Sequence, residues 1–402
     1  MKRIKSWFQN SFEDKNNPVL GPSLKLLHFV GLQNIEDRWA LYAINVIIFF
    51  EMMLTCGEAI ELLKDSGDLF AITENLCVSS VTVVCMHKIY AMKASRDKHD
   101  AIISGIAYEE HQLNDVTNPY HNSFVEYKNY AHIVVKLYFF AVYPAALFLT
   151  TRPLAVYLYS EEYHTESNET VPKPFMISIW YPFDSNSYWG YRAAITLQGL
   201  MIFHHASVIY AFDSYCFSIW IFFKGHLKII GQKSIDLFTD DAKQILDEET
   251  VSKRFKECHR HHIHILKIKS LFNSMLSPVM FGYVIVYSIC LCSCVVQLVL
   301  GAGSTFHKLC ILGYTGPLIG ELFLFCWHVT DVVFQHMQLS RDVFMSDWWA
   351  ATPYFRKQLH MFANQLSLPV FFTAGPFTML SLATFIELMK GSYSFYTVLT
   401  RT

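Results

Sequence analysis

Seven long apolar runs constrain the fold of this chain more than any other feature of its sequence. They cover roughly residues 39–60, 69–92, 131–151, 191–223, 263–300, 307–328 and 377–399. A helix of about 20 apolar residues is long enough to cross the hydrocarbon core of a bilayer. The pattern therefore predicts an all-α membrane protein with seven transmembrane helices.

Two of the runs are too long for a simple crossing. At about 1.5 Å per residue, the fourth run would reach about 50 Å and the fifth about 57 Å, whereas the hydrocarbon is about 30 Å thick. We therefore expect both helices to project into water on one side of the membrane. Pro278 is expected to kink the fifth helix.

The composition agrees with a membrane protein and argues against other classes. Only 16% of the 402 residues are charged, against roughly 25% in soluble domains. The net charge of −2 does not indicate a nucleic-acid partner. No apolar segment of the secretory type precedes Pro18, so the first apolar run must itself direct the chain to the membrane. Most of the ten cysteines fall inside apolar runs, which favours reduced thiols over a disulfide framework.

Basic residues in the connecting segments predict the orientation of the chain. The richer side comprises the tail before the first run, with six Lys and Arg residues, and the segments 93–130, 224–262 and 329–368, with four, eight and three. The alternate segments 61–68, 152–190 and 301–306 hold one, two and none. Because Lys and Arg accumulate on the cytoplasmic side, the N-terminus is predicted in the cytoplasm and the C-terminus outside. A glycosylation sequon at Asn168 falls in an outside loop and agrees with this orientation.

The C-terminal segment carries the most specific pattern in the chain. Pro369 and Pro376 precede the last apolar run, whose second half is rich in hydroxyl side chains. The pattern comprises Leu366 to Gly375 (LSLPVFFTAG), Ser381-Leu382, Phe385, and Ser392 to Phe395. Together with seven spans, an inside N-terminus and the chain length, it resembles the insect odorant receptors, and more specifically a ligand-tuned subunit. The family often has Lys after Ala-Gly, whereas this chain has Pro376, which would shift the break before the last helix.

The resemblance implies a subunit of a tetrameric, non-selective cation channel whose seventh helices line one central pore. A tuned subunit binds a small, apolar, volatile odorant and assembles with a shared co-receptor subunit (Orco) in a heterotetramer. Its implied location is the plasma membrane of olfactory sensory neurons, as a multi-pass protein. The chain lacks the long insertion between spans four and five that the co-receptor itself would carry.

On this interpretation the chain divides into four regions. Residues 1–38 form a cytoplasmic N-terminal segment. Residues 39–328 hold spans one to six, with the odorant pocket in their outer half. Residues 224–270 and 329–368 form a cytoplasmic region where subunits meet, called the anchor region below. Residues 369–402 form the pore-lining seventh helix.

A helical wheel places polar side chains of the last run on one stripe. At 100° per residue, the residues that share an arc of about 100° are Lys390, Tyr393, Thr397, Thr400 and Arg401. Such a stripe is typical of a pore lining, where ions exchange hydration for hydroxyl contacts, and also of a face on which transmembrane helices pack. The resemblance favours the pore and places its gate near Thr397, Val398 and Arg401. A positive Arg401 in a cation pore would require partner subunits that do not repeat it.

The resemblance places the odorant pocket among the outer halves of spans two, three, four and six. Candidate lining residues, at helical spacings of three and four, are Ile72, Asn75, Leu76, Ser79, Tyr138, Val142, Ala145, Leu149, Met201, His205 and Tyr314. Asn75, Ser79 and Tyr314 are expected to orient a ligand in an otherwise apolar cavity. The same residues are also compatible with the ordinary core of a helix bundle.

Two further groups of residues are candidates for a functional role. Four histidines, His259, His261, His262 and His264, cluster around the start of the fifth run, but their spacing is not HExxH and no carboxylate lies between them. We therefore predict no metal, no cofactor and no catalytic residue. Asp213 and Glu321 are acids within membrane spans, and such residues are functional candidates by default.

Three alternatives remain open at this point. A gustatory-type chemoreceptor would be a related channel, but that branch typically carries Gln where Leu399 stands. A G-protein-coupled receptor would have its N-terminus outside, and the chain lacks an Asp-Arg-Tyr triplet after the third span and an Asn-Pro-x-x-Tyr motif in the seventh. A membrane enzyme with a histidine metal centre is the third alternative, and no enzymatic activity is predicted.

Overall fold

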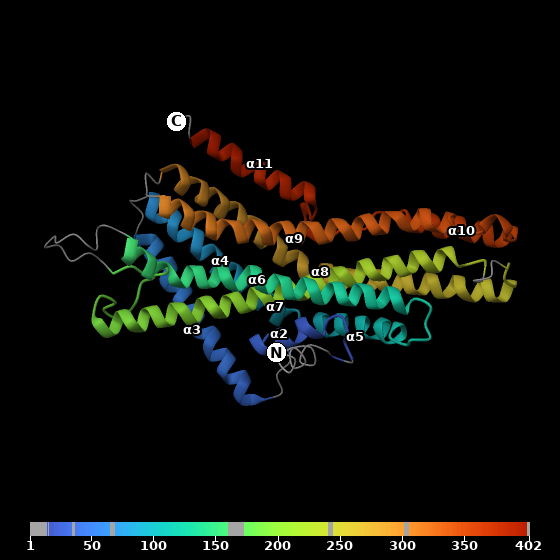
Figure 1. The fold of residues 1–402 in the computed structure, drawn as a ribbon, viewed down its shortest axis with the longest axis horizontal. Coiled ribbons are helices and arrows are strands. Elements are labelled where there is room, and N and C mark those ends of the chain that lie inside the picture. Colours follow the sequence, from blue (N-terminus) through green and yellow to red (C-terminus); the bar gives the residue numbers. More distant parts are fainter. Residues whose placement is uncertain are drawn as a thin grey trace.

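Long helices make up most of the chain in the computed structural model (Figure 1). The structure describes residue 14 and residues 16–33, 37–64, 69–159, 173–239, 244–300 and 305–399. The helices are α2 (Gly21–Val30), α3 (Arg38–Lys64), α4 (Leu69–Ala94), α5 (Arg96–Leu113), α6 (His121–Tyr159), α7 (Tyr188–Ile235), α8 (Glu248–Leu300), α9 (Thr305–Phe344), α10 (Pro353–Leu366) and α11 (Leu382–Leu399). A 3₁₀ turn, η2 (Trp348–Ala350), precedes α10, and two short strands, β1 (Thr373–Ala374) and β2 (Thr378–Met379), precede α11. The nine cysteines that the structure describes form no disulfide bond.

Six of the seven predicted runs lie wholly on helices, and several of these helices continue well past the predicted ends. The fourth run, predicted to end at 223, continues on α7 to Ile235, and the fifth, predicted from 263, begins on α8 at Glu248. Within the described residues, α3, α6, α7, α8 and α9 are long and apolar enough to cross a membrane. The predicted projection of the fourth and fifth helices beyond the membrane follows from these lengths, since α7 spans 48 residues and α8 spans 53.

The last apolar run was predicted to be helical from residue 377, but its helix begins later in the structure. Strands β1 and β2 form an antiparallel hairpin, and α11 begins only at Leu382. Gly375 turns the hairpin with a φ of +70°, and a Cβ at this position would lie 2.6 Å from Phe281 Cδ2. The Gly375 N–H donates to the Ser277 carbonyl at 3.0 Å, so the hairpin is fixed to α8. Helix α11 has 18 residues, about 27 Å at about 1.5 Å per residue.

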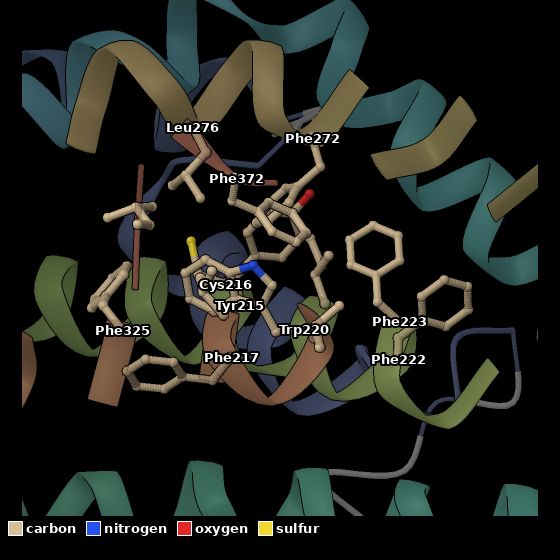
Figure 2. Packing of buried hydrophobic residues seen from close by; sticks show 14 of the residues in the cluster. Tyr215, Cys216, Phe217, Trp220, Phe222, Phe223, Phe272, Leu276, Phe325 and Phe372 are labelled. Carbon is tan, nitrogen blue, oxygen red and sulfur yellow. The ribbon is translucent and has the colours of Figure 1, made fainter. Parts of the chain in front are cut away.

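Helix α7 forms the centre of the molecule, and most of its residues between Ala194 and Ser234 are buried. An aromatic cluster surrounds Trp220, whose ring centroid lies 5.4 Å from Phe325 on α9 and 5.8 Å from Phe272 on α8. Figure 2 shows Phe372, which precedes the hairpin, pointing into the same cluster, with ring centroids 6.2 Å from Trp220. The core therefore joins α7, α8 and α9 to the segment that leads into α11.

The anchor region is mostly helical and contains the ends of α7 and α9, the beginning of α8 and all of α10. Amphipathic α10 buries Phe355, Leu359 and Phe362 and packs on α9, at the end of the molecule opposite the C-terminus (Figure 1). Helix α5 lies in the segment 93–130, which the sequence indicated only as a connection, and it packs on α8. Helix α2, also not predicted, packs on α7 and gives the N-terminal segment an ordered part.

Candidate ligand-binding site

A cavity of about 160 Å³ lies among α4, α6, α7, α8 and α9. Most of its wall is apolar, and Ile177 from the segment before α7 contributes to it. The volume is close to that of a cavity of about 150 Å³ that accepts benzene in another protein. A small, largely apolar molecule therefore fits the space.

Five of the eleven predicted lining residues meet at this cavity. They are Tyr138, Val142, Ala145 and Leu149 on α6, and His205 on α7. The four residues of α6 follow spacings of three and four, so they share one helix face. The small Ala145 side chain leaves space on this face between two larger apolar residues.

The residues predicted from the second span lie on other faces of α4. The α4 residues that line the cavity are Glu74, Cys77, Val78, Val81 and Thr82. Asn75 and Ser79 instead bond to each other, with Ser79 Oγ donating to Asn75 Oδ1 at 2.7 Å. Ile72 and Leu76 are half-buried away from the cavity. This helix mixes polar and apolar residues on every face, so its sequence did not indicate which face would turn inward.

Met201, another predicted lining residue, lies apart from the described cavity wall. Met201 is buried in a neighbouring apolar cluster with Met176 and Ile177, while Ile202 beside it in sequence faces the cavity. The side chain of Tyr314 lies outside the described residues, although its backbone belongs to α9.

A buried ion-pair cluster adjoins the cavity on the side of Tyr138 and Glu321. Lys88 Nζ on α4 lies 2.7 Å from Asp213 Oδ1 and 3.0 Å from Glu321 Oε1. Tyr138 donates to the other oxygen of Asp213 at 2.8 Å, and Tyr287 donates to Glu321 Oε2 at 2.9 Å. Tyr138 and Glu321 also line the cavity, so the ligand space and the ion-pair cluster share side chains. The two intramembrane acids are thus paired, and Lys88 is the partner that sequence reasoning missed.

Polar groups elsewhere on the wall could orient a ligand. Glu74 and Arg152 form an ion pair between α4 and α6 at the outer end of the cavity. The Gln297 side chain on α8 lines the cavity and is 4% exposed. Its amide nitrogen is buried and has no hydrogen-bond partner among the described residues. His205 Nε2 lies 3.5 Å from Glu51 Oε1, beyond an ordinary hydrogen bond.

Helix α11 packs on α8 and α9 along one face only. Phe385 and Leu388 turn toward the core, whereas Lys390 is exposed and Tyr393 is 66% exposed within the single chain. The predicted polar stripe therefore begins on the side that faces away from its own bundle. Thr397 donates to the carbonyl of Ser394, one turn earlier, at 2.8 Å. Several predicted site residues lie outside the described residues. They are the side chain of Val398, the residues Thr400 and Arg401, and the sequon at Asn168.

Comparisons with known proteins agree with this arrangement. The sequence model of a family described as "7tm Odorant receptor" matches residues 69–393. Odorant receptor 13a of Drosophila melanogaster is 20% identical over 84% of this chain and 82% of its own length. Odorant receptor 82a of the same fly is 22% identical over 57% of this chain, and the match spans only 58% of that receptor.

Solved structures show the same fold at low sequence identity. The insect olfactory receptor OR5 from Machilis hrabei superposes with a TM-score of 0.78 and 14% identity, covering 99% of this chain and 98% of that chain. The structure of OR5 in complex with eugenol superposes equally well, with a TM-score of 0.78 over 96% of this chain and all of that chain.

Proposed function

Since the chain belongs to the 7tm odorant receptor family of insects, we propose that it is the odorant-binding subunit of a ligand-gated cation channel. It is a multi-pass membrane protein, and its relatives are receptors rather than enzymes. The proposed orientation has the N-terminus and the anchor region in the cytoplasm. The single observation that carries the proposal is the cavity enclosed by α4 and α6 to α9.

The proposed ligand is a small, apolar volatile with one hydrogen-bond acceptor. The apolar face of α6 around Val142, Ala145 and Leu149 accommodates its hydrocarbon part. The buried, unpartnered amide nitrogen of Gln297 can donate to a carbonyl, ether or hydroxyl oxygen. An unsatisfied buried donor is costly, so a ligand that accepts this hydrogen bond gains affinity over a pure hydrocarbon.

The proposed gating mechanism links the cavity to α11 through packed side chains. Phe325, one turn from Glu321 on α9, packs on Trp220, and Trp220 packs on Phe372 at the root of the hairpin before α11. A ligand that fits the cavity better when α11 is displaced shifts the population toward the open state. The exposed face of α11, with Lys390 and Tyr393, would then line a pore shared with neighbouring subunits.

The proposed partner is the shared co-receptor subunit of the family, which would complete the tetramer. The test is a recording of membrane current from cells that express this chain, a co-receptor, or both, during exposure to a panel of volatile esters, ketones and alcohols. We expect odorant-evoked cation current only when both are present. Odorant-evoked current from this chain alone would contradict the obligate partnership, and a co-receptor response unchanged by this chain would contradict its role in odorant binding.

A further inference from the structure

Three helices bring a carboxylate and three imidazoles together beside the anchor region, and none of these four residues lines the ligand cavity. Glu109 lies on α5, His226 on α7, and His261 and His264 one turn apart on α8. Glu109, His226 and His261 are at most 6% exposed, and their ligand atoms all lie within 4.8 Å of one another. Of the four histidines that cluster in the sequence, only two join this site, and the carboxylate that the cluster lacked comes from α5.

The donor atoms of Glu109, His226 and His261 have the spacing of a compact coordination site. His226 Nδ1 lies 2.9 Å from His261 Nε2, and His261 Nε2 lies 3.4 Å from Glu109 Oε2. His264 Nδ1 lies 2.5 Å from the other oxygen of Glu109. Ligands at about 2.0–2.2 Å from a tetrahedral zinc ion are separated by roughly 3.4 Å. A metal ion could therefore replace the proton that His226 and His261 now share, with little movement of either ring.

Two side chains beside the site, Tyr127 and Lys233, affect metal binding in opposite directions. His226 faces the site with Nδ1, and its second ring nitrogen, Nε2, lies 2.9 Å from the Tyr127 hydroxyl on α6. A hydrogen bond to the second nitrogen of a ligating histidine fixes the ring and tunes its basicity. Lys233 acts in the opposite sense, because its Nζ lies 3.3 Å from His261 Nδ1 and its positive charge repels a cation.

We propose that Glu109, His226 and His261 form a zinc-binding site that joins α5 to α7 and α8 of the anchor region, with His264 bonded to the second oxygen of Glu109. The set of imidazole nitrogens and one carboxylate is the type that zinc prefers over calcium or magnesium. Bound zinc would crosslink three helices at the region where subunits are proposed to meet. The site is independent of the odorant cavity, so its test does not depend on the proposed function.

The direct test measures metal binding by the purified, full-length chain in detergent or lipid nanodiscs. After removal of metal with a chelator, the protein is titrated with Zn²⁺, and the bound metal is quantified per chain. Co²⁺ is then used as a spectroscopic probe. We expect one zinc per chain and the visible absorption bands of Co²⁺ in a tetrahedral site. The absence of stoichiometric zinc and of these bands from the folded, unaltered chain would overturn the proposal and leave a hydrogen-bond network.

Variants separate coordination from a general effect on folding. Glu109→Gln and His226→Gln should each lose the cobalt bands, whereas His259→Gln, in the same histidine cluster but outside the site, should keep them. Tyr127→Phe should weaken zinc binding roughly tenfold, as for other outer-shell partners. Lys233→Met should strengthen zinc binding because it removes a nearby cation. Equal zinc binding by Glu109→Gln, His226→Gln and the unaltered chain would also overturn the proposal.

Discussion

The Lys88 ammonium on α4 lies 2.7 Å from the Asp213 carboxylate on α7, and neither side chain is more than 1% exposed. Glu321 on α9 is the second partner of the same ammonium group, at 3.0 Å. Removing charges from water is costly, and only close, hydrogen-bonded pairing offsets that cost. This cluster therefore ties α4, α7 and α9 together beside the ligand cavity.

Loss of the Lys88 charge should destabilise the protein strongly. Lys88→Met would leave two carboxylates buried without a cation, for which the cost is about 3–5 kcal/mol. The matched control is Lys224→Met, because Lys224 pairs with Asp331 at 2.6 Å but is 40% exposed. That pair should contribute only about 0–1 kcal/mol. Thermal unfolding of the purified variants measures the difference, and equal losses in both would contradict the role given to the buried cluster.

The stability of the protein should fall as the pH rises toward 8, because of Glu110 on α5. Burial raises the pKa of the Glu110 carboxyl to about 8, although the Val19 N–H donates to it at 3.2 Å and Lys128 is nearby. The folded state therefore holds the proton more tightly than the unfolded state, whose value is near 4.5. The contribution of Glu110 to the free energy of unfolding is greatest below about pH 4.5 and decreases as the pH rises to about pH 8.

Glu110→Gln should remove this part of the pH dependence. Unfolding temperatures measured from about pH 5.5 to about pH 8 should change less in Glu110→Gln than in the unaltered chain. The control is Glu126→Gln, since Glu126 is 69% exposed and pairs with Lys228 at the surface. An unchanged pH profile in Glu110→Gln would show that this carboxyl is already ionised in the folded protein.

Two glycines near the C-terminus should respond to alanine in opposite directions. Gly375→Ala would force a left-handed backbone onto a residue with a Cβ and bring that Cβ to 2.6 Å from Phe281, so the hairpin should be displaced and stability lost. Gly391 lies inside α11, and apart from its chain neighbours and the backbone of its own helix no described atom lies within 4 Å of the position that an alanine Cβ would occupy there. Gly391→Ala should therefore stabilise the helix by roughly 0.5–1 kcal/mol. Thermal unfolding of the two variants compares them, and a stable Gly375→Ala protein would contradict the role of the turn.

The exposed face of α11 should be accessible from an aqueous pore in the assembled channel. Tyr393 is 66% exposed within the chain, whereas Leu388 packs against the core. In channels containing Tyr393→Cys, a charged, water-soluble thiol reagent should alter the odorant-evoked current. Leu388→Cys is the control and should be insensitive. The reverse pattern would assign the packed face, rather than the polar stripe, to the pore.

The transmembrane helices could be predicted because their sequence signal is strong and local. Apolar runs located the helices of all seven predicted spans, whereas Ala145 on α6 was placed among the lining residues by the family resemblance and not by a pattern in the sequence. The extensions of α7 and α8 into the anchor region were expected from the lengths of the fourth and fifth runs, whereas α2 and α5 were not, because helices in water are as polar as loops. The break before α11 depends on Gly375 meeting Ser277 and Phe281 on α8, a contact between segments about 100 residues apart in the sequence.

The missed site residues depend on tertiary contacts that a single sequence does not display. Lys88 lies inside the predicted second span, but only the fold brings it to Asp213 and Glu321. Glu109 similarly meets His261 only through the packing of α5 on α8. On α4 the apolar residues do not form one stripe, so the choice of the face with Asn75 had no periodic signal to support it.

The most direct test of odorant binding in the cavity compares two phenylalanine substitutions on α6 in channels formed with the co-receptor. Ala145 lines the cavity, whereas Leu147 is 56% exposed on the outer face of the same helix. The measurement is the odorant concentration that gives half-maximal current. We predict that Ala145→Phe fills the cavity and raises this concentration at least about tenfold, or about 1.4 kcal/mol, while Leu147→Phe leaves it unchanged. An unchanged odorant response in Ala145→Phe channels would contradict binding in this cavity.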